Sequence, residues 1–282
     1  MISTKERGDS VRTELVYCLK NRYYRIGLCL LVMGFVFYTF LYFYGLQITV
    51  SDYQMAAETF VPFSFNPDRT LSALHFWFGT EVSYRLPEQT FSFYGSVFAC
   101  LLIPILLALF NLDSYLQDVK GNVKNIRIAK SGKYRYYYSK LFSVFLVSFF
   151  SLFVLQLLQF IAGWGIDNLT NLISQPTPIQ ASDLITVVGI SARISLFYAI
   201  ILSFSFSISL YLEKIPAAVY ALPLIVTVAT AIYIKPQPYN LAFLYSNLRD
   251  DSMFSFYSFT FILIGISLLL VLIKTKKKDQ IA

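Results

Sequence analysis

Apolar residues along this chain gather into long uninterrupted runs, which are separated by polar segments of very unequal length. Six runs reach about the 20 residues that an α-helix needs to cross a hydrocarbon core roughly 30 Å thick, and none contains Asp, Glu, Lys, Arg or His. They cover about residues 26–46, 91–110, 141–166, 194–212, 215–234 and 254–273. The pattern predicts an all-α integral membrane protein with six transmembrane helices.

Composition agrees with this prediction. The 282 residues are 56% hydrophobic and 14% charged, whereas soluble domains carry about a quarter charged residues. The first run follows 25 residues and precedes no small-residue cleavage site, so we expect a retained helix and not a signal peptide. The domain organisation is then a cytoplasmic N-terminal segment, 1–25, followed by a single transmembrane domain, 26–282.

The basic residues orient the predicted helices. If both termini are cytoplasmic, 18 of the 23 Lys and Arg residues fall in the inner segments, which are 1–25, 111–140, 213–214 and 274–282. The outer loops instead carry 9 of the 16 acidic residues, and they span 47–90, 167–193 and 235–253. Because cytoplasmic loops are enriched in Lys and Arg, we expect a multi-pass protein of a bacterial cell membrane. The net charge of +7 then reflects attraction to the inner leaflet and no nucleic-acid partner.

Residues 10–25 predict an amphipathic helix at the inner membrane surface, with Asp9 or Ser10 as its N-cap. Apolar and polar residues fall on opposite sides of this helix; Val11, Leu15, Cys18 and Leu19 lie on one side, and Arg12, Glu14, Lys20 and Arg22 largely on the other. A basic amphipathic helix next to a span typically lies in the interface. We assign Leu15, Leu19, Arg22 and Arg25 to this interfacial helix. The alternative is a solvated leader that only sets orientation.

The outer loops carry weaker signals. Loop 47–90 is rich in aromatic residues, which favour the headgroup boundary, so we expect short helices there, and we interpret His75 as a polar contact and not as a metal ligand. In 167–193, Ser182 or Asp183 could cap a short helix leading to Arg193. A further interfacial helix is expected in 235–253.

The inner loop 111–140 contains the basic and aromatic stretch IRIAKSGKYRYYYSKL at 126–141. RNA-binding surfaces need a folded platform, for which the loop has no room. We interpret the tyrosines as the aromatic belt of the third span and the basic side chains as its inner anchors. The tyrosines are Tyr134, Tyr136, Tyr137 and Tyr138, and the anchors are Lys130, Lys133, Arg135 and Lys140.

The front of this loop carries an acidic residue and a glycine, Asp118 and Gly121, then a polar run through Ile128, Ser131-Gly132, and the basic and aromatic run ending at Lys140. With the six spans and the N-terminal helix, it resembles the permease subunits of the ABC-2 family of ATP-driven transporters. The resemblance implies a cytoplasmic coupling helix that docks on a separate ATPase. Its candidate contact residues are Asp118, Gly121, Lys124, Ile126, Arg127 and Ile128, with the isoleucines as apolar anchors. The alternative is a solvated connection between two spans.

The same resemblance implies two ATPase subunits, a second permease subunit in a homo- or heterodimer, and export of an amphipathic or hydrophobic substrate such as a peptide, lipid-linked molecule or drug. ATP and Mg would be bound by the ATPase, and no cofactor by this chain. The sequence agrees that ATP is not bound by this chain. Its only Gly-Lys pair, Gly132-Lys133, has Arg127 where a phosphate loop needs its first glycine. The spans carry no ionisable group for ion coupling. No G-x-S-x-G motif appears and the single histidine is isolated, so we expect neither an enzyme nor a metal site.

Two other functions stay open. The first alternative is a non-transporting polytopic membrane protein, such as a sensor partner or scaffold. A channel comes third, because charged pore rings are missing from the spans. Four serines of the fourth span, Ser203, Ser205, Ser207 and Ser209, could bond between helices or line a path, although packing is the favoured interpretation.

Overall fold

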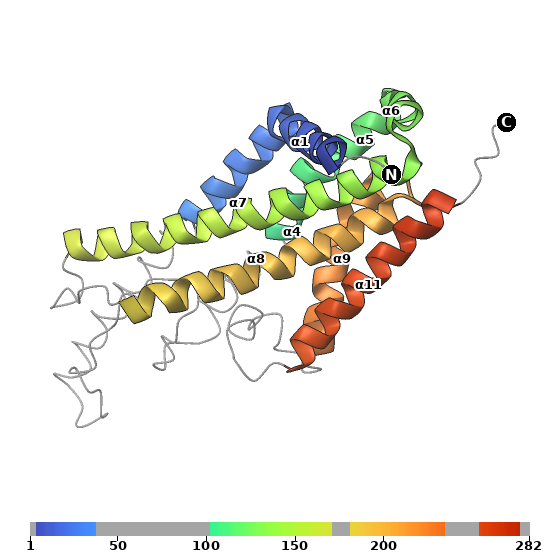
Figure 1. Ribbon diagram of the computed structural model, residues 1–282. Coiled ribbons are helices and arrows are strands. Elements are labelled where there is room, and N and C mark those ends of the chain that lie inside the picture. The colour runs from blue at the N-terminus through green and yellow to red at the C-terminus, as the bar shows by residue number, and fades with distance from the viewer. Residues whose placement is uncertain (1–3, 38–101, 171–180, 235–253, 277–282) are drawn as a thin grey trace, which may run out of the picture.

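The computed structural model describes residues 4–37, 102–170, 181–234 and 254–276, and every regular element in these ranges is helical (Figure 1). The all-α prediction is therefore confirmed for the described part of the chain. A helix over 22–37 follows the first one, α1. The other elements are α1 (Thr4–Lys20), α4 (Ile103–Asn111), α5 (Asp113–Lys120), α6 (Val123–Ser131), α7 (Lys133–Thr170), α8 (Ala181–Ser209), α9 (Pro216–Ile234) and α11 (Phe254–Lys276).

Two of the described helices are long and apolar enough to cross a bilayer. One is the Lys133–Ala162 part of α7 and the other is the Val187–Ser209 part of α8. A shorter apolar helix covers Pro216–Thr230 within α9. Helices α9 and α11 coincide with the fifth and sixth predicted spans within three residues at each end. The described parts of the first two spans, 26–37 and 102–110, are also helical.

Helix α8 begins earlier than the sequence predicted. The fourth span was placed from residue 194, with Ser182 or Asp183 capping a short outer helix that leads to Arg193, and the two form one helix, because α8 runs without a break from Ala181. The physical reason is that no proline separates the two segments, and Gly189 alone costs only about 1 kcal/mol in a helix. The predictions for 47–90, His75 and 235–253 lie outside the described residues.

The N-terminal helix also differs from its prediction. Helix α1 begins at Thr4, so neither Asp9 nor Ser10 is its N-cap, and it ends at Lys20 and not at residue 25. A new helix starts after Asn21, whose Oδ1 accepts a hydrogen bond from the backbone N–H of Tyr23 at 3.0 Å. Such a contact is an N-cap. Arg22 and Arg25 therefore belong to the helix over 22–37, which contains the described part of the first predicted span.

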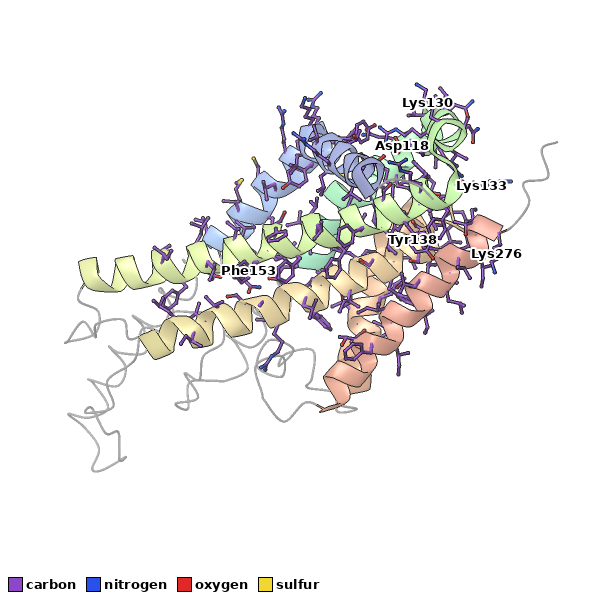
Figure 2. All side chains as sticks on the ribbon, in the orientation of Figure 1. Asp118, Lys130, Lys133, Tyr138, Phe153 and Lys276 are labelled. Atoms are coloured by element: carbon purple, nitrogen blue, oxygen red, sulfur yellow. The ribbon has the colours of Figure 1, made fainter. Side chains whose placement is uncertain are left out.

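The helices pack around α7 and α8, which run antiparallel side by side (Figure 1). Helix α1 and the short helices α5 and α6 lie near the beginning of α7, and the end of α11 reaches the same end of the bundle. In Figure 2, Lys130, Lys133 and Lys276 also lie at this end, whereas Phe153 lies farther along α7. We call this end the basic end.

The serines of α8 pack within their own helix. Three of the hydroxyls donate to the carbonyl four residues earlier, and Ser209 donates to the carbonyl three residues earlier, with distances of 2.6 to 2.9 Å. All four side chains are buried. The bonds shown are thus not between helices, and small self-satisfied side chains let neighbouring helices approach α8 closely.

Candidate functional site

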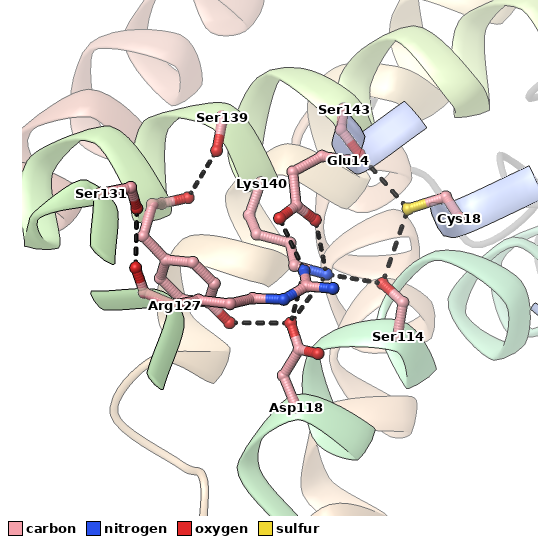
Figure 3. A network of polar contacts seen from close by, with 10 residues as sticks. Glu14, Cys18, Ser114, Asp118, Arg127, Ser131, Ser139, Lys140 and Ser143 are labelled. Atoms are coloured by element: carbon pink, nitrogen blue, oxygen red, sulfur yellow. Dashed lines mark hydrogen bonds and ion pairs between the residues drawn. The ribbon is translucent and has the colours of Figure 1, made fainter. Parts of the chain in front are cut away.

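Four charged side chains from four helices meet in the interior of the basic end (Figure 3). We call them the ionic cluster: Glu14 of α1, Asp118 of α5, Arg127 of α6 and Lys140 of α7. The Lys140 ammonium lies 3.0 Å from Glu14 Oε2 and 3.0 Å from Asp118 Oδ2. Arg127 Nη1 lies 2.7 Å from Glu14 Oε1 and 3.5 Å from Asp118 Oδ2. Two cations thus balance two anions.

A tight turn brings α6 back toward these partners. Helix α5 ends at Lys120, and Asn122 adopts the left-handed conformation with φ of 57° before α6 starts at Val123. Gly132, with φ of 81°, separates α6 from α7, and a side chain is strained in that conformation. The two sharp reversals fold α6 against the first turns of α7, so Arg127 can reach Asp118.

Neutral groups complete the ionic cluster. The hydroxyl of Tyr136 donates to Asp118 Oδ2 at 3.0 Å, and the Lys140 ammonium donates to Ser114 Oγ at 3.5 Å. The Tyr17 ring lies under both cations, with its centroid 4.3 Å from the Arg127 guanidinium carbon and 5.0 Å from the Lys140 ammonium. Cations are attracted to the face of an aromatic ring, so Tyr17 replaces part of the lost hydration.

Burial makes this arrangement interdependent. Solvent reaches neither Lys140 nor Asp118, and an isolated buried charge is strongly unfavourable unless it is paired. Burial alone would lower the pKa of Arg127, but the carboxylates of Glu14 and Asp118 raise it above its usual value. Removing one member would leave another buried charge without its partner. The ionic cluster therefore holds α1, α5, α6 and α7 in one arrangement.

A second set of contacts centres on Glu213, in the short connection between α8 and α9. Its carboxylate accepts hydrogen bonds from the Tyr115 hydroxyl and the Lys124 ammonium, both at 2.6 Å. Lys274, near the end of α11, lies 3.2 Å from it. Burial would raise the pKa of Glu213, yet the bonds from Lys124 and Tyr115 and the charges of Lys124 and Lys274 lower it. This Glu213 cluster joins α5, α6 and α11 to the α8–α9 connection.

Helix α5 has a third anchor. The carboxylate of Asp113 accepts hydrogen bonds from the Tyr220 hydroxyl of α9 at 2.5 Å and from Gln117 Nε2 at 2.6 Å. Both acidic residues of α5 and its Tyr115 thus contact other side chains. Side chains of α5 therefore contact α6, α7, α9 and the α8–α9 connection.

The predicted coupling residues take different positions. Asp118 is fully buried, and Lys124 and Arg127 bind acidic residues of this chain, so these three side chains hold the loop in place internally. Gly121 is exposed in the α5–α6 turn, Ile128 packs partly against the core, and Ile126 is 57% exposed. Of the two predicted apolar anchors, only Ile126 projects from the folded loop.

Two further interpretations from the sequence are corrected. Tyr136, Tyr137 and Lys140 were assigned to the membrane boundary, but all three are buried because α1, α5 and α6 cover the first turns of α7. Tyr134, by contrast, is exposed.

Glu14 was placed on the polar face of the N-terminal helix, yet it is buried with Cys18, while Leu19 is exposed and Leu15 packs partly against the core. Glu213 was not identified at all. The one available signal was its position as the only acidic residue in the two-residue inner segment between two apolar runs.

Comparison with protein-family models, with characterised proteins and with solved structures finds no match for this chain.

Proposed function

We propose that this chain is the membrane-spanning permease subunit of an ATP-driven transporter of the ABC-2 type, with six transmembrane helices and cytoplasmic termini. The basic end would face the cytoplasm. This subunit would pair with a second permease subunit and with two ATPase subunits that bind ATP and Mg. The substrate path would lie between the two permease subunits, and the transporter would export an amphipathic or hydrophobic molecule along it.

The observation that carries the proposal is the attachment of α6. No side chain of this helix is fully buried, yet Arg127 attaches it to α1 and α5, and Lys124 attaches it to the α8–α9 connection. A solvated connection between two spans has no need of buried charge pairs, which cost several kcal/mol of desolvation per ion. A helix that transmits motion from an ATPase to the spans does need such charge pairs, because they fix it rigidly to the other helices. Displacement of α6 would move α1, α7, α8 and α9 together.

Orientation is supported by the distribution of charge. Exposed Lys and Arg side chains gather at the basic end on elements far apart in sequence, and these include Lys20, Lys120, Lys130, Lys214 and Lys276. Positive charge of this kind marks the cytoplasmic side of membrane proteins. Large apolar side chains are exposed along the helices themselves, for example Phe150 and Leu158 of α7 and Phe261 of α11. Such side chains suit contact with lipid or with another subunit.

The test introduces one negative charge at the projecting anchor. We expect Ile126→Asp to abolish both copurification of the cognate ATPase and ATP-dependent transport. The carboxylate would be buried without a partner in the apolar groove of the ATPase on which α6 would dock. Asn125→Asp is the matched control, since Asn125 is an exposed neighbour on the same helix. It should retain both activities. Gly121→Pro should also uncouple transport, by changing the α5–α6 turn. Normal ATPase binding and turnover in Ile126→Asp would refute the docking role of α6.

A further inference from the structure

Helix α1 has two distinct faces. The inner face carries Glu14 and Cys18, which are buried against α5 and α7. The opposite face carries Arg12, Val16 and Leu19, all exposed. Residues 12, 16 and 19 share one side because they are spaced by four and three positions. Exposed aliphatic groups beside a cation are typical of a helix lying in the membrane interface.

The next helix, over 22–37, carries an exposed apolar stripe of its own. Its exposed side begins with Arg22, Tyr23 and Arg25 and then becomes apolar. The stripe consists of Ile26, Leu30, Met33 and Phe37. At 1.5 Å per residue it extends over about 16 Å, roughly half of a hydrocarbon core. If this helix enters a bilayer, the change from charged to apolar within one turn would place the level of the lipid phosphates at residues 22–25.

The charge of this surface is almost entirely positive. Four cations are exposed along the elbow between α1 and the following helix: Arg12, Lys20, Arg22 and Arg25. Among residues 11–37, whose side chains the structure describes in this part of the chain, Glu14 is the only acidic residue, and it points inward to Arg127 and Lys140. The elbow therefore presents cations at the end of an apolar stripe.

We propose that this elbow is a binding site for anionic phospholipids of the inner leaflet. The phosphate lies against Arg22 and Arg25, with Lys20 beside it and Arg12 farther back along α1, and an acyl chain follows the stripe from Ile26 to Phe37. Basic segments next to a span attract anionic lipids in this way. The inference rests on the membrane embedding of the proposed function, but it requires neither the ATPase nor transport.

Other occupants fit this surface less well. An acidic segment of a soluble protein would satisfy the cations and leave the apolar stripe uncovered. A second copy docked through the same face about a two-fold axis would bring like charges together. A lipid alone combines a negative group with an apolar chain, in the order in which the elbow presents their partners.

The experiment counts bound lipid on the purified full-length protein. In detergent micelles, the protein is titrated with phosphatidylglycerol or with phosphatidylcholine, and native mass spectrometry measures the lipid retained. One variant neutralises the elbow, with Arg12→Gln, Lys20→Gln, Arg22→Gln and Arg25→Gln. The matched control neutralises four exposed lysines elsewhere at the basic end, with Lys120→Gln, Lys130→Gln, Lys214→Gln and Lys276→Gln.

We expect the wild type to bind phosphatidylglycerol in preference to phosphatidylcholine. The elbow variant should bind phosphatidylglycerol at least about tenfold more weakly, since each cation near an anionic headgroup contributes about 1 kcal/mol, and the control should stay within about twofold of the wild type. An equal loss in the control would show that net charge alone matters and would overturn the site, as would unchanged binding in the elbow variant or equal binding of the two lipids.

A charge-conserving variant guards against misfolding. Arg12→Lys, Arg22→Lys and Arg25→Lys together keep all four positive charges and should retain binding of phosphatidylglycerol, because a lipid phosphate accepts an ammonium as well as a guanidinium. Loss of binding in this variant would also overturn the proposal. The assay contains no ATPase and no nucleotide, so its outcome is independent of the test of α6 as a coupling helix.

Discussion

The Lys140 ammonium lies 3.0 Å from a carboxylate oxygen of Asp118, and solvent reaches neither side chain. The residues are 22 positions apart and belong to the loop and the span that follows it. Between them the chain makes two sharp turns and adds Arg127, which contacts the same carboxylate oxygen. Glu14 then restores neutrality from a different part of the chain. The basic end is thus assembled around charges that only a folded loop can pair.

Replacing one member of this pair should destabilise the protein strongly. We expect Lys140→Met to lower the free energy of unfolding by about 3–5 kcal/mol, because two carboxylates would share one remaining cation in a buried site. Thermal unfolding in detergent measures the effect.

The double variant Asp118→Asn with Lys140→Met provides the control. It leaves Glu14 paired with Arg127 at 2.7 Å, so it should be more stable than Lys140→Met alone. Additive losses from the two substitutions would show that the two charges do not depend on each other.

The pattern of the sequence predicted much of the fold correctly, for identifiable reasons. Helices α9 and α11 follow their predicted spans because Pro216 and Lys274 mark the ends of the apolar runs. The short helix expected before Arg193 and the fourth span form one helix, α8, because neither proline nor a turn separates them. The break at Asn21 was missed because polar residues continue on both sides of it.

The ionic cluster could not be predicted from periodicity. A pattern of polar and apolar residues assigns every charge to the outside, so Glu14 and Lys140 were placed facing solvent or headgroups. Their burial depends on each other and on partners more than 100 positions away. The attachment of the loop through Glu213 likewise required the three-dimensional arrangement.

The turn before α6 offers a test of backbone strain. Asn122 has φ of 57°, a conformation that asparagine and glycine tolerate and β-branched residues do not. We expect Asn122→Val to cost about 1–3 kcal/mol, and Asn122→Gly to stay close to the wild type in the same thermal unfolding measurement. Equal losses in both variants would point to the hydrogen bond from Asn125 to the Asn122 side chain as the source of stability.

A buried amide in α7 leads to the prediction that its replacement stabilises the protein. The Gln156 side chain is fully buried, and neither of its polar atoms has a hydrogen-bond partner in the described part of the chain. An unsatisfied buried polar group costs about 1–3 kcal/mol. We therefore expect Gln156→Met, which has similar volume, to raise the thermal unfolding midpoint. A lower midpoint would show that the amide binds a water molecule, a substrate group or another subunit.

The Glu213 cluster should make stability depend on pH in the acidic range. Contacts with Lys124, Tyr115 and Lys274 outweigh burial and hold the pKa of Glu213 below its ordinary value of 4.5. A group whose pKa is lower in the folded state stabilises the fold fully above its unfolded pKa, and this contribution is lost as the pH falls through the folded pKa. The wild type should therefore be more stable than Glu213→Gln at pH 6 to 8, by a constant margin.

That margin should shrink below about pH 4.5, because protonation gives the wild-type carboxyl the same charge as the amide of Glu213→Gln. The two proteins are compared by thermal unfolding from pH 3.5 to 8, and the difference between them removes the contribution of the other carboxylates, which both share. A margin that stays constant down to pH 3.5 would mean that Glu213 acts by shape and hydrogen bonding alone. A margin that disappears on acidification would show that the charge of Glu213 holds α6 and α11 to the α8–α9 connection.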